Sequence, residues 1–385
     1  MHLAGGLFAA LDFTTLPQQL VSGVLLGAIY ALIALGYTMV YGVLRLINFA
    51  HGEVFMLGAY TSLLTSYYLG YGKDSHQDTS SPLNLVLLLL ASMLVCGIIG
   101  VLIERFAYRP MRNQPRIAAL ITAIGVSMLL QYGGALVLPN SPPPSISEKV
   151  NPYRGAHTFY LAAPEAELVQ TEASKRQEFE SAESQWKQAQ AAKATDDVVK
   201  PLRDKKIAAE RGYNDAQRKL SVSGVKIIVP YGQLIMFGTT LFLMGVLTYL
   251  VMFTKQGRAM RAVSHDFDSA SLMGINVGSV VTFTFFLGSM LAGAGAMMNS
   301  TFFGTPLTTF YGMQPGVKAF VAAVLGGIGN IPGAVFGGLL MGVAETLVIW
   351  LGYSNYRDAI AFVILIVVLL FKPGGLLGSA KVEKV

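Results

Sequence analysis

The chain has 385 residues, of which 53% are hydrophobic and only 13% are charged, whereas soluble domains carry about 25% charged residues. This deficit argues against a soluble enzyme or a nucleic-acid-binding domain and predicts an integral membrane protein. The formal net charge is +6, and we attribute the excess of Lys and Arg to the loops that hold membrane helices in one orientation.

A helix that crosses the hydrocarbon core needs about 20 apolar residues. The stretch 317–350 is too long for one crossing, and "GGIGNIPG" at 326–333 interrupts it, so we predict two shorter helices joined by a turn. The fold class is therefore an all-α polytopic membrane protein with about 8–9 transmembrane helices, some of them broken. The predicted membrane helices lie at 20–44, 54–70, 83–103, 117–138, 233–253, 277–298, 317–350 and 359–371.

Basic residues predict the orientation of these helices. Four arginines lie between 105 and 116, and Lys255, Arg258 and Arg261 lie in a second loop. Both loops should be cytoplasmic, because Lys and Arg accumulate on that side. Two predicted helices separate the loops, so the polar segment between those helices should lie on the outer side.

That outer segment, residues 139–225, divides the chain into N-terminal membrane helices (1–138), an extracytoplasmic insert and C-terminal membrane helices (226–385). The insert begins with a Pro-rich linker and continues with Ala, Glu, Gln and Lys, which favour helix. We predict an antiparallel helical hairpin whose two helices join near 195–201. Its sparse apolar residues suffice for a thin seam, which leaves three interpretations: a solvated spacer, an arm that contacts an external partner, or a partly disordered segment.

The motif "RLINFAHGEVFMLGAY" at 45–60 places Arg45, Asn48, His51 and Glu53 between apolar stretches. Ionisable groups within membrane helices are costly and are therefore functional candidates. His51 and Glu53 are two apart, so they do not share a helix face, which argues against a metal site. The group could end one helix and cap the next, with Asn48 as N-cap, or it could line a translocation path. A proton relay is a third interpretation.

The interruption at 326–333 contains Gly326, Gly327 and Asn330 but no charge. Non-helical backbone at membrane depth requires protein or water to satisfy its polar groups, and such broken helices often border substrate sites. A tight turn between two helices is the alternative. Glu345, in the apolar stretch that follows, needs a partner, and Lys318 lies before the interruption.

The loop "GRAMRAVSHDFDSASLMGINVGS", 257–279, is too long for a simple turn. Ser264 or Asp266 can cap a short helix that contains Ala270 and ends at Gly274. This helix could dock another protein or could be an ordinary surface helix.

The chain contains no phosphate-binding loop and no HExxH, GxSxG or CxxC sequence. We therefore expect no enzymatic activity, no catalytic residues, no metal site and no cofactor. If transport is active, its energy must come from an ion gradient or from another subunit.

Several long motifs occur together: "GAIYALIALGYTMVYGVLRLINFAHGEVFMLGAY", "ERFAYRPMR", "LITAIGVSMLLQ", "KAFVAAVLGGIGNIPGAVFGGLLMGVAE" and "KPGGLLG". In this order they resemble the LivH-type permease, one of the two membrane subunits of the bacterial branched-chain amino acid ABC importer. The resemblance covers roughly 17–138 and 226–385. The insert is a departure, because the family usually has a shorter external segment there.

The resemblance implies a LivM-like second permease, two cytoplasmic ATPase subunits and an extracytoplasmic amino-acid-binding protein, all acting at the bacterial inner membrane. It implies that the 257–279 loop contacts the ATPases, and it favours the pathway interpretation of the two interruptions. Related permeases carry urea or short-chain amides, and an ion-coupled secondary transporter remains a competing class. The implied ATPase-coupling residues are Arg261, His265, Asp266, Asp268, Met273 and Gly274, and the implied pathway residues are Asn48, His51, Glu53, Gly326, Gly327 and Asn330.

Overall fold

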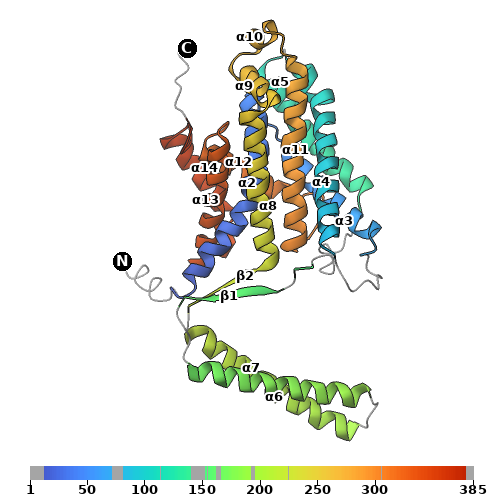
Figure 1. Ribbon diagram of the computed structural model, residues 1–385, viewed down its shortest axis with the longest axis vertical. Coiled ribbons are helices and arrows are strands. Elements are labelled where there is room, and N and C mark those ends of the chain that lie inside the picture. Colours follow the sequence, from blue (N-terminus) through green and yellow to red (C-terminus); the bar gives the residue numbers. More distant parts are fainter. Residues whose placement is uncertain are drawn as a thin grey trace. The chain divides into compact units, whose positions relative to one another are not determined.

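The computed structural model describes residues 13–71, 81–112, 114–139, 152–153, 155–161, 166–191, 196–223, 225–304 and 306–378. The chain forms two compact units (Figure 1). Unit 1 comprises residues 1–19 and 156–229, and unit 2 comprises residues 20–155 and 230–385.

Unit 2 is a bundle of helices that coincide with the predicted apolar stretches, which confirms the all-α polytopic class. Within the described ranges, six helical segments are long and apolar enough to cross a membrane. The prediction of about 8–9 spans also counted three others, which are shorter or less apolar. The bundle contains α2 (Leu16–Leu44), α3 (His51–Tyr68), α4 (Pro82–Ile103), α5 (Arg116–Val137), α8 (Tyr231–Phe253), α11 (Val277–Phe302), α12 (Met313–Gly326), α13 (Ile331–Trp350) and α14 (Ala359–Phe371).

Helix α2 packs closely against α13 because both present glycines four residues apart. Gly23 and Gly27 of α2 face Gly338 and Gly342 of α13. A Cβ atom on Gly27 would lie only 2.7 Å from the Cα atom of Leu339. Such pairs of small residues let two membrane helices approach closely enough for backbone contact.

Small residues also join α3, α4 and α11. The hydroxyl of Ser92 in α4 lies 3.0 Å from the carbonyl oxygen of Gly58 in α3 and 2.8 Å from that of Gly293 in α11, so it bridges α3 and α11. The fully buried Cys96 places its Sγ atom 3.3 Å from the carbonyl oxygen of Val54. Cys96 is therefore a packing residue, as its position in an apolar stretch predicts.

Unit 1 contains the predicted helical hairpin, made of α6 (Ala166–Ala191) and α7 (Asp196–Ser223). The predicted seam is present: Phe179 stacks on Tyr213 at a centroid distance of 5.9 Å, and the Lys206 Nζ atom lies 4.5 Å from the Trp186 ring centroid. Three buried alanines complete the contact, Ala182, Ala209 and Ala216.

Two features of unit 1 differ from the prediction. Pro201, near the predicted joint, does not separate the helices but lies inside α7, where it leaves one helical hydrogen bond unmade because proline has no amide N–H. In addition, we did not predict the two-stranded sheet that β1 (Ala156–Tyr160) forms with β2 (Lys226–Pro230). Within unit 1, the side chain of Gln18 binds both backbone groups of Ile228, donating at 3.0 Å and accepting at 2.6 Å.

Candidate translocation and coupling site

The turn between α2 and α3 carries the first group of predicted site residues. Asn48 is buried, and its Oδ1 atom accepts hydrogen bonds from the Ala50 amide and the Tyr108 hydroxyl, both at 3.1 Å. The N-cap of α3 is Ala50, which makes no side-chain cap bond, so the expectation that Asn48 is the N-cap was wrong. Asn48 instead braces the turn against the residues that follow α4.

His51 begins α3 deep within the bundle. Its ring is fully buried and contacts Tyr37 edge-on at a centroid distance of 4.6 Å. The ring occupies a notch at Gly36, where any Cβ atom would collide with it, and Gly288 of α11 approaches the same glycine. Gly36 lies eight residues before the end of α2, or about 12 Å along the helix axis. The chain therefore re-enters the bundle between Arg45 and His51.

Glu53 points in a different direction from His51, as their spacing predicts. Its Oε1 atom accepts a 2.5 Å hydrogen bond from the Gln131 side chain of α5. Helix α5 is otherwise largely exposed along its length. Glu53 is itself buried and thus lies between α3 and a helix whose other faces are exposed.

Several buried polar atoms around this turn have no hydrogen-bond partner in the part of the chain that the structure describes. They are the Thr38 hydroxyl, the Asn48 Nδ2 atom, both ring nitrogens of His51 and the Glu53 Oε2 atom. Buried polar groups are nearly always paired, because leaving them unpaired costs free energy. These atoms can therefore bind water or the polar groups of a solute.

The second interruption is closed by the C-terminal segment. Helix α12 ends at Gly326, and Gly327 adopts a φ of 105° that favours glycine. Asn330 caps α13 by accepting from the Gly333 amide at 3.2 Å, and it donates to the Leu377 carbonyl at 2.7 Å. In addition, the Leu377 amide donates to the Gly326 carbonyl at 3.1 Å. The "KPGGLLG" motif thus satisfies the polar backbone of the interruption, a contact that the sequence reasoning missed.

The predicted coupling loop forms two helices, α9 (Lys255–His265) and α10 (Phe267–Leu272). Of the two predicted caps, Asp266 is the one used: its carboxylate accepts a 2.6 Å hydrogen bond from the Ser269 amide, which lowers the pKa of Asp266. Gly274 ends the element with a φ of 81°. Beside it, Leu272 and Met273 are 88% and 83% exposed, which is unusual for large apolar side chains and suits a docking surface.

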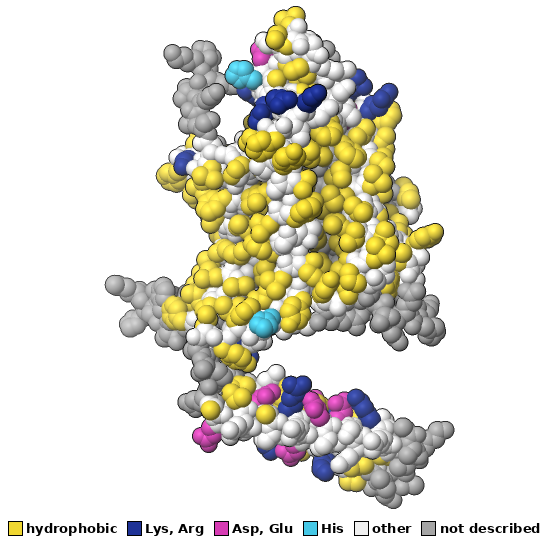
Figure 2. All heavy atoms as spheres, in the orientation of Figure 1, with side chains coloured by type: hydrophobic (Ala, Val, Ile, Leu, Met, Phe, Trp, Pro, Cys, Tyr) yellow, Lys and Arg dark blue, Asp and Glu magenta, His cyan; other side chains and the backbone are white. Residues whose placement is uncertain are grey.

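Two cavities bring α9 and α10 next to both interruptions. One, of about 350 Å³, is lined by Arg45 of the first turn together with His265 and Asp266. The other, of about 80 Å³, is lined by Thr38 of α2, Gly329 of the second interruption and Arg261. Three of the predicted coupling residues, Arg261, His265 and Asp266, therefore lie beside the two interruptions at one end of unit 2, although none of the predicted pathway residues lines either cavity. Lys and Arg side chains gather at the same end, whereas apolar side chains cover the flanks (Figure 2).

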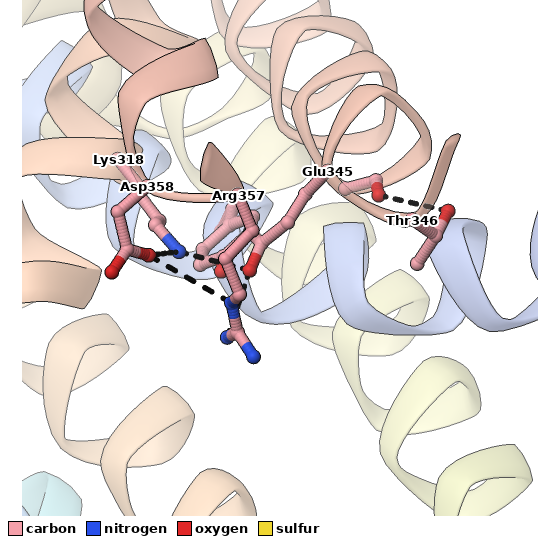
Figure 3. Close-up of polar contacts among 7 residues, drawn as sticks. Lys318, Glu345, Thr346, Arg357 and Asp358 are labelled. Carbon is pink, nitrogen blue, oxygen red and sulfur yellow. Dashed lines mark hydrogen bonds and ion pairs between the residues drawn. The ribbon is translucent and has the colours of Figure 1, made fainter. Parts of the chain in front are cut away.

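An ion network centred on the buried Glu345 joins four helices of the bundle (Figure 3). From the sequence we predicted only that Glu345 needs a partner. The Lys318 Nζ atom lies 2.9 Å from Glu345 and 2.6 Å from Asp358. Glu345, which is fully buried, also pairs with Arg357 at 2.8 Å and accepts a 2.6 Å hydrogen bond from the Tyr30 hydroxyl. The network fixes α2, α12 and α13 to the start of α14.

The fold and these sites define a multi-pass helical membrane protein with interrupted helices and a pair of short helices, α9 and α10, at one end of the bundle. The family model described as "Branched-chain amino acid transport system / permease component" matches residues 19–369, and the chain belongs to this family.

Curated relatives match over nearly their whole lengths. The chain is 36% identical to the high-affinity branched-chain amino acid transport system permease protein BraD of Pseudomonas aeruginosa, over 96% of this chain and 97% of that protein. It is 35% identical to the corresponding permease protein LivH of Escherichia coli strain K12, over 97% of this chain and 99% of that protein. The LivH protein of Salmonella typhimurium is 34% identical over the same fractions. No solved structure matches the chain significantly.

Proposed function

We propose that the chain is the membrane-spanning permease subunit of an ABC importer in the bacterial inner membrane and that it translocates branched-chain amino acids. A second, LivM-like permease, two cytoplasmic ATPases and an extracytoplasmic binding protein complete the transporter. The names of the relatives support the substrate class. The observation that carries the mechanism is the position of α9 and α10, which share cavities with both helix interruptions.

In this mechanism, the exposed surface of α10 docks on an ATPase, with Asp268, Met273 and Gly274 at the contact. Closure of the ATPases displaces α9, and Arg261, His265 and Asp266 pass the displacement to the two turns. The chain therefore acts as a two-state element whose equilibrium the ATPases shift, rather than as a catalyst.

The solute route follows the unpaired polar groups at Asn48, His51 and Glu53. Gly326, Gly327 and Asn330 border the route by fixing the turn between α12 and α13. Their hydrogen bonds to the C-terminal segment support this role, because they hold the turn in one conformation.

The test is transport by the assembled complex in proteoliposomes, with labelled leucine, isoleucine or valine and the binding protein on the outer side. We expect uptake that requires ATP and both ATPases and that persists when ionophores collapse ion gradients. Uptake by this chain alone, driven by an ion gradient, would identify a secondary transporter. ATP-driven uptake of urea or a short-chain amide in preference to leucine would refute the substrate assignment.

The residue-level proposal has its own test in the same assay. Glu53→Gln keeps the shape of the side chain but removes the charge, and we expect it to lower the maximal uptake rate without preventing assembly. Glu167→Gln, on the exposed surface of α6, is the matched control and should leave uptake unchanged. Equal uptake by Glu53→Gln and the control would remove Glu53 from the route.

A further inference from the structure

Two cavities of opposite character adjoin at the α9 end of unit 2. The first, of about 350 Å³, is the polar cavity lined by Arg45, Arg112, Gln114 and His265 among others. The second, of about 290 Å³, is lined by Tyr41, Leu46, Ile47, Ile117 and Leu120 together with Arg45 and Ala119. The cavities share Arg45, Leu46 and Ala119, so they lie side by side, and we refer to the two together as the amphipathic cleft. The first is within the size range of cavities that bind small ligands, about 300–1,000 Å³, and the second lies just below it.

Arg45 holds an unusual backbone conformation at the junction of the two halves. It is the only non-glycine residue in the described ranges with a positive φ, at 54°, and it follows the last residue of α2. Glycine is usual at this position after a helix, and a larger residue there is strained by about 1–2 kcal/mol. Strained backbone of this kind clusters at functional sites.

The charge of the polar half favours an anion. Arg112 lies in its wall, where it pairs with the buried Glu104, and Glu104 is held in turn by the Thr282 hydroxyl at 2.8 Å. Asp266 is the one carboxylate in the lining, and its Oδ1 atom already accepts a hydrogen bond from the Ser269 amide. The lining thus carries two guanidinium groups and the His265 ring against one carboxylate.

The apolar half favours a hydrocarbon chain. Its walls are the end of α2 and the start of α5, and Ile117 is 68% exposed on the flank of the bundle. A ligand that fills both halves needs an anionic head and an apolar tail. Basic cavities between membrane helices on the cytoplasmic side are suited to anionic lipid headgroups.

We propose that this cleft binds an anionic phospholipid of the inner leaflet, with its phosphate at Arg45 and Arg112 and an acyl chain along Ile47, Ile117 and Leu120. Because His265 and Asp266 belong to both the cleft and the coupling element, the bound lipid braces α9 against the first turn. This second step rests on the proposed function, whereas lipid binding itself does not.

Lipid retention by the assembled transporter tests the site. The complex is purified from nanodiscs that contain equal amounts of phosphatidylglycerol and phosphatidylcholine with identical acyl chains, and the retained lipid is counted by mass spectrometry. We expect phosphatidylglycerol to be retained preferentially. Arg45→Asn, which tolerates a positive φ, should lower this retention about fivefold. Arg105→Gln removes an exposed charge at the same end, outside the cleft, and should change nothing.

Other outcomes would overturn the proposal. Equal retention of both lipids, or an equal loss in Arg45→Asn and Arg105→Gln, would show that no specific site exists. Full displacement of the lipid by glycerol 3-phosphate would show that the apolar half plays no part. Ile117→Trp, which fills the apolar half, should reduce retention, and unchanged retention in this variant would contradict the assigned path of the acyl chain.

A transport assay separates this proposal from the proposed function. ATP-driven uptake should be faster in phosphatidylglycerol than in phosphatidylcholine, and Arg45→Asn should bring the ratio of the two rates to about one. If no ATP-driven uptake occurs in any lipid while retention is selective, the proposed function fails and the lipid site stands. If uptake occurs without selective retention, the lipid site fails alone.

Discussion

The ion pair between Lys318 and Glu345 gives the most quantitative test of the fold. The side chains are 3% and 0% exposed, so water screens their interaction very little. Removing one partner of a buried pair typically costs about 3–5 kcal/mol, because the remaining charge is left without compensation. Here each residue keeps another partner: Glu345 keeps Arg357 at 2.8 Å, and Lys318 keeps Asp358 at 2.6 Å.

We therefore expect Lys318→Met and Glu345→Gln each to lower the free energy of unfolding by the lower end of that range, about 3 kcal/mol. The double variant removes both charges, and its loss should be about 2 kcal/mol smaller than the sum of the two single losses, since residues in one network couple by about 0.5–3 kcal/mol. Arg357 and Asp358, which already form an ion pair at 3.8 Å, then keep each other as partners.

Denaturant titration of the detergent-purified protein measures these losses. Lys175→Met serves as the control, because Lys175 and Glu178 form an exposed pair on α6 and such pairs contribute little. Two results would contradict this expectation. In one, the losses of unfolding free energy in the two single variants would add up to the loss in the double variant; in the other, neither single loss would exceed the loss in Lys175→Met.

Three further outcomes follow from contacts elsewhere in the chain. Gly27→Leu should separate α2 from α13, since even a Cβ atom would lie 2.7 Å from the backbone of Leu339, and the yield of folded protein in size-exclusion chromatography should fall sharply. Asn330→Ala should lower the free energy of unfolding by about 1–2 kcal/mol, and Asn330→Asp should recover part of this loss because an aspartate still caps α13; equal losses would contradict the cap. Asp266→Ala should speed amide hydrogen exchange in α10, whereas Asp266→Asn should not. Because the Ser269 amide lowers the pKa of Asp266, the stabilisation should be complete at neutral pH and lost as the pH falls below the ordinary aspartate range. A protection factor in α10, corrected for the intrinsic pH dependence of amide exchange, that does not change with pH would contradict this expectation.

The sequence predicted the helices well because the signals involved are local. The length of the apolar stretches predicted the membrane helices, and glycines predicted the interruption after α12. The sequence of the coupling loop offered Ser264 and Asp266 as candidate helix caps, and Asp266 is the one used. The spacing of His51 and Glu53 also predicted that they face different neighbours. Each of these predictions depends on residues within one or two helical turns.

The missed features depend on contacts between residues far apart in the chain. The pairing of Lys318 with Glu345 joins residues 27 apart and also needs Asp358 to complete it. The bond between Asn330 and the C-terminal segment spans 47 residues, and the one between Gln18 and Ile228 spans 210. The sequence showed that Glu345 needs a partner and that the interruption needs hydrogen bonds, but only the packing of the helices identifies the groups that supply them.

The orientation of the chain underlies the whole account, and cysteine labelling measures it directly. Cys96 is fully buried, so it adds little background when a membrane-impermeant maleimide is applied to spheroplasts. Ser184→Cys on α6 should be labelled in intact spheroplasts, whereas Leu272→Cys on α10 should be labelled only after the membrane is opened. The reverse pattern would place α9 and α10 on the side away from ATP, and the proposed contact with the ATPases would then be impossible.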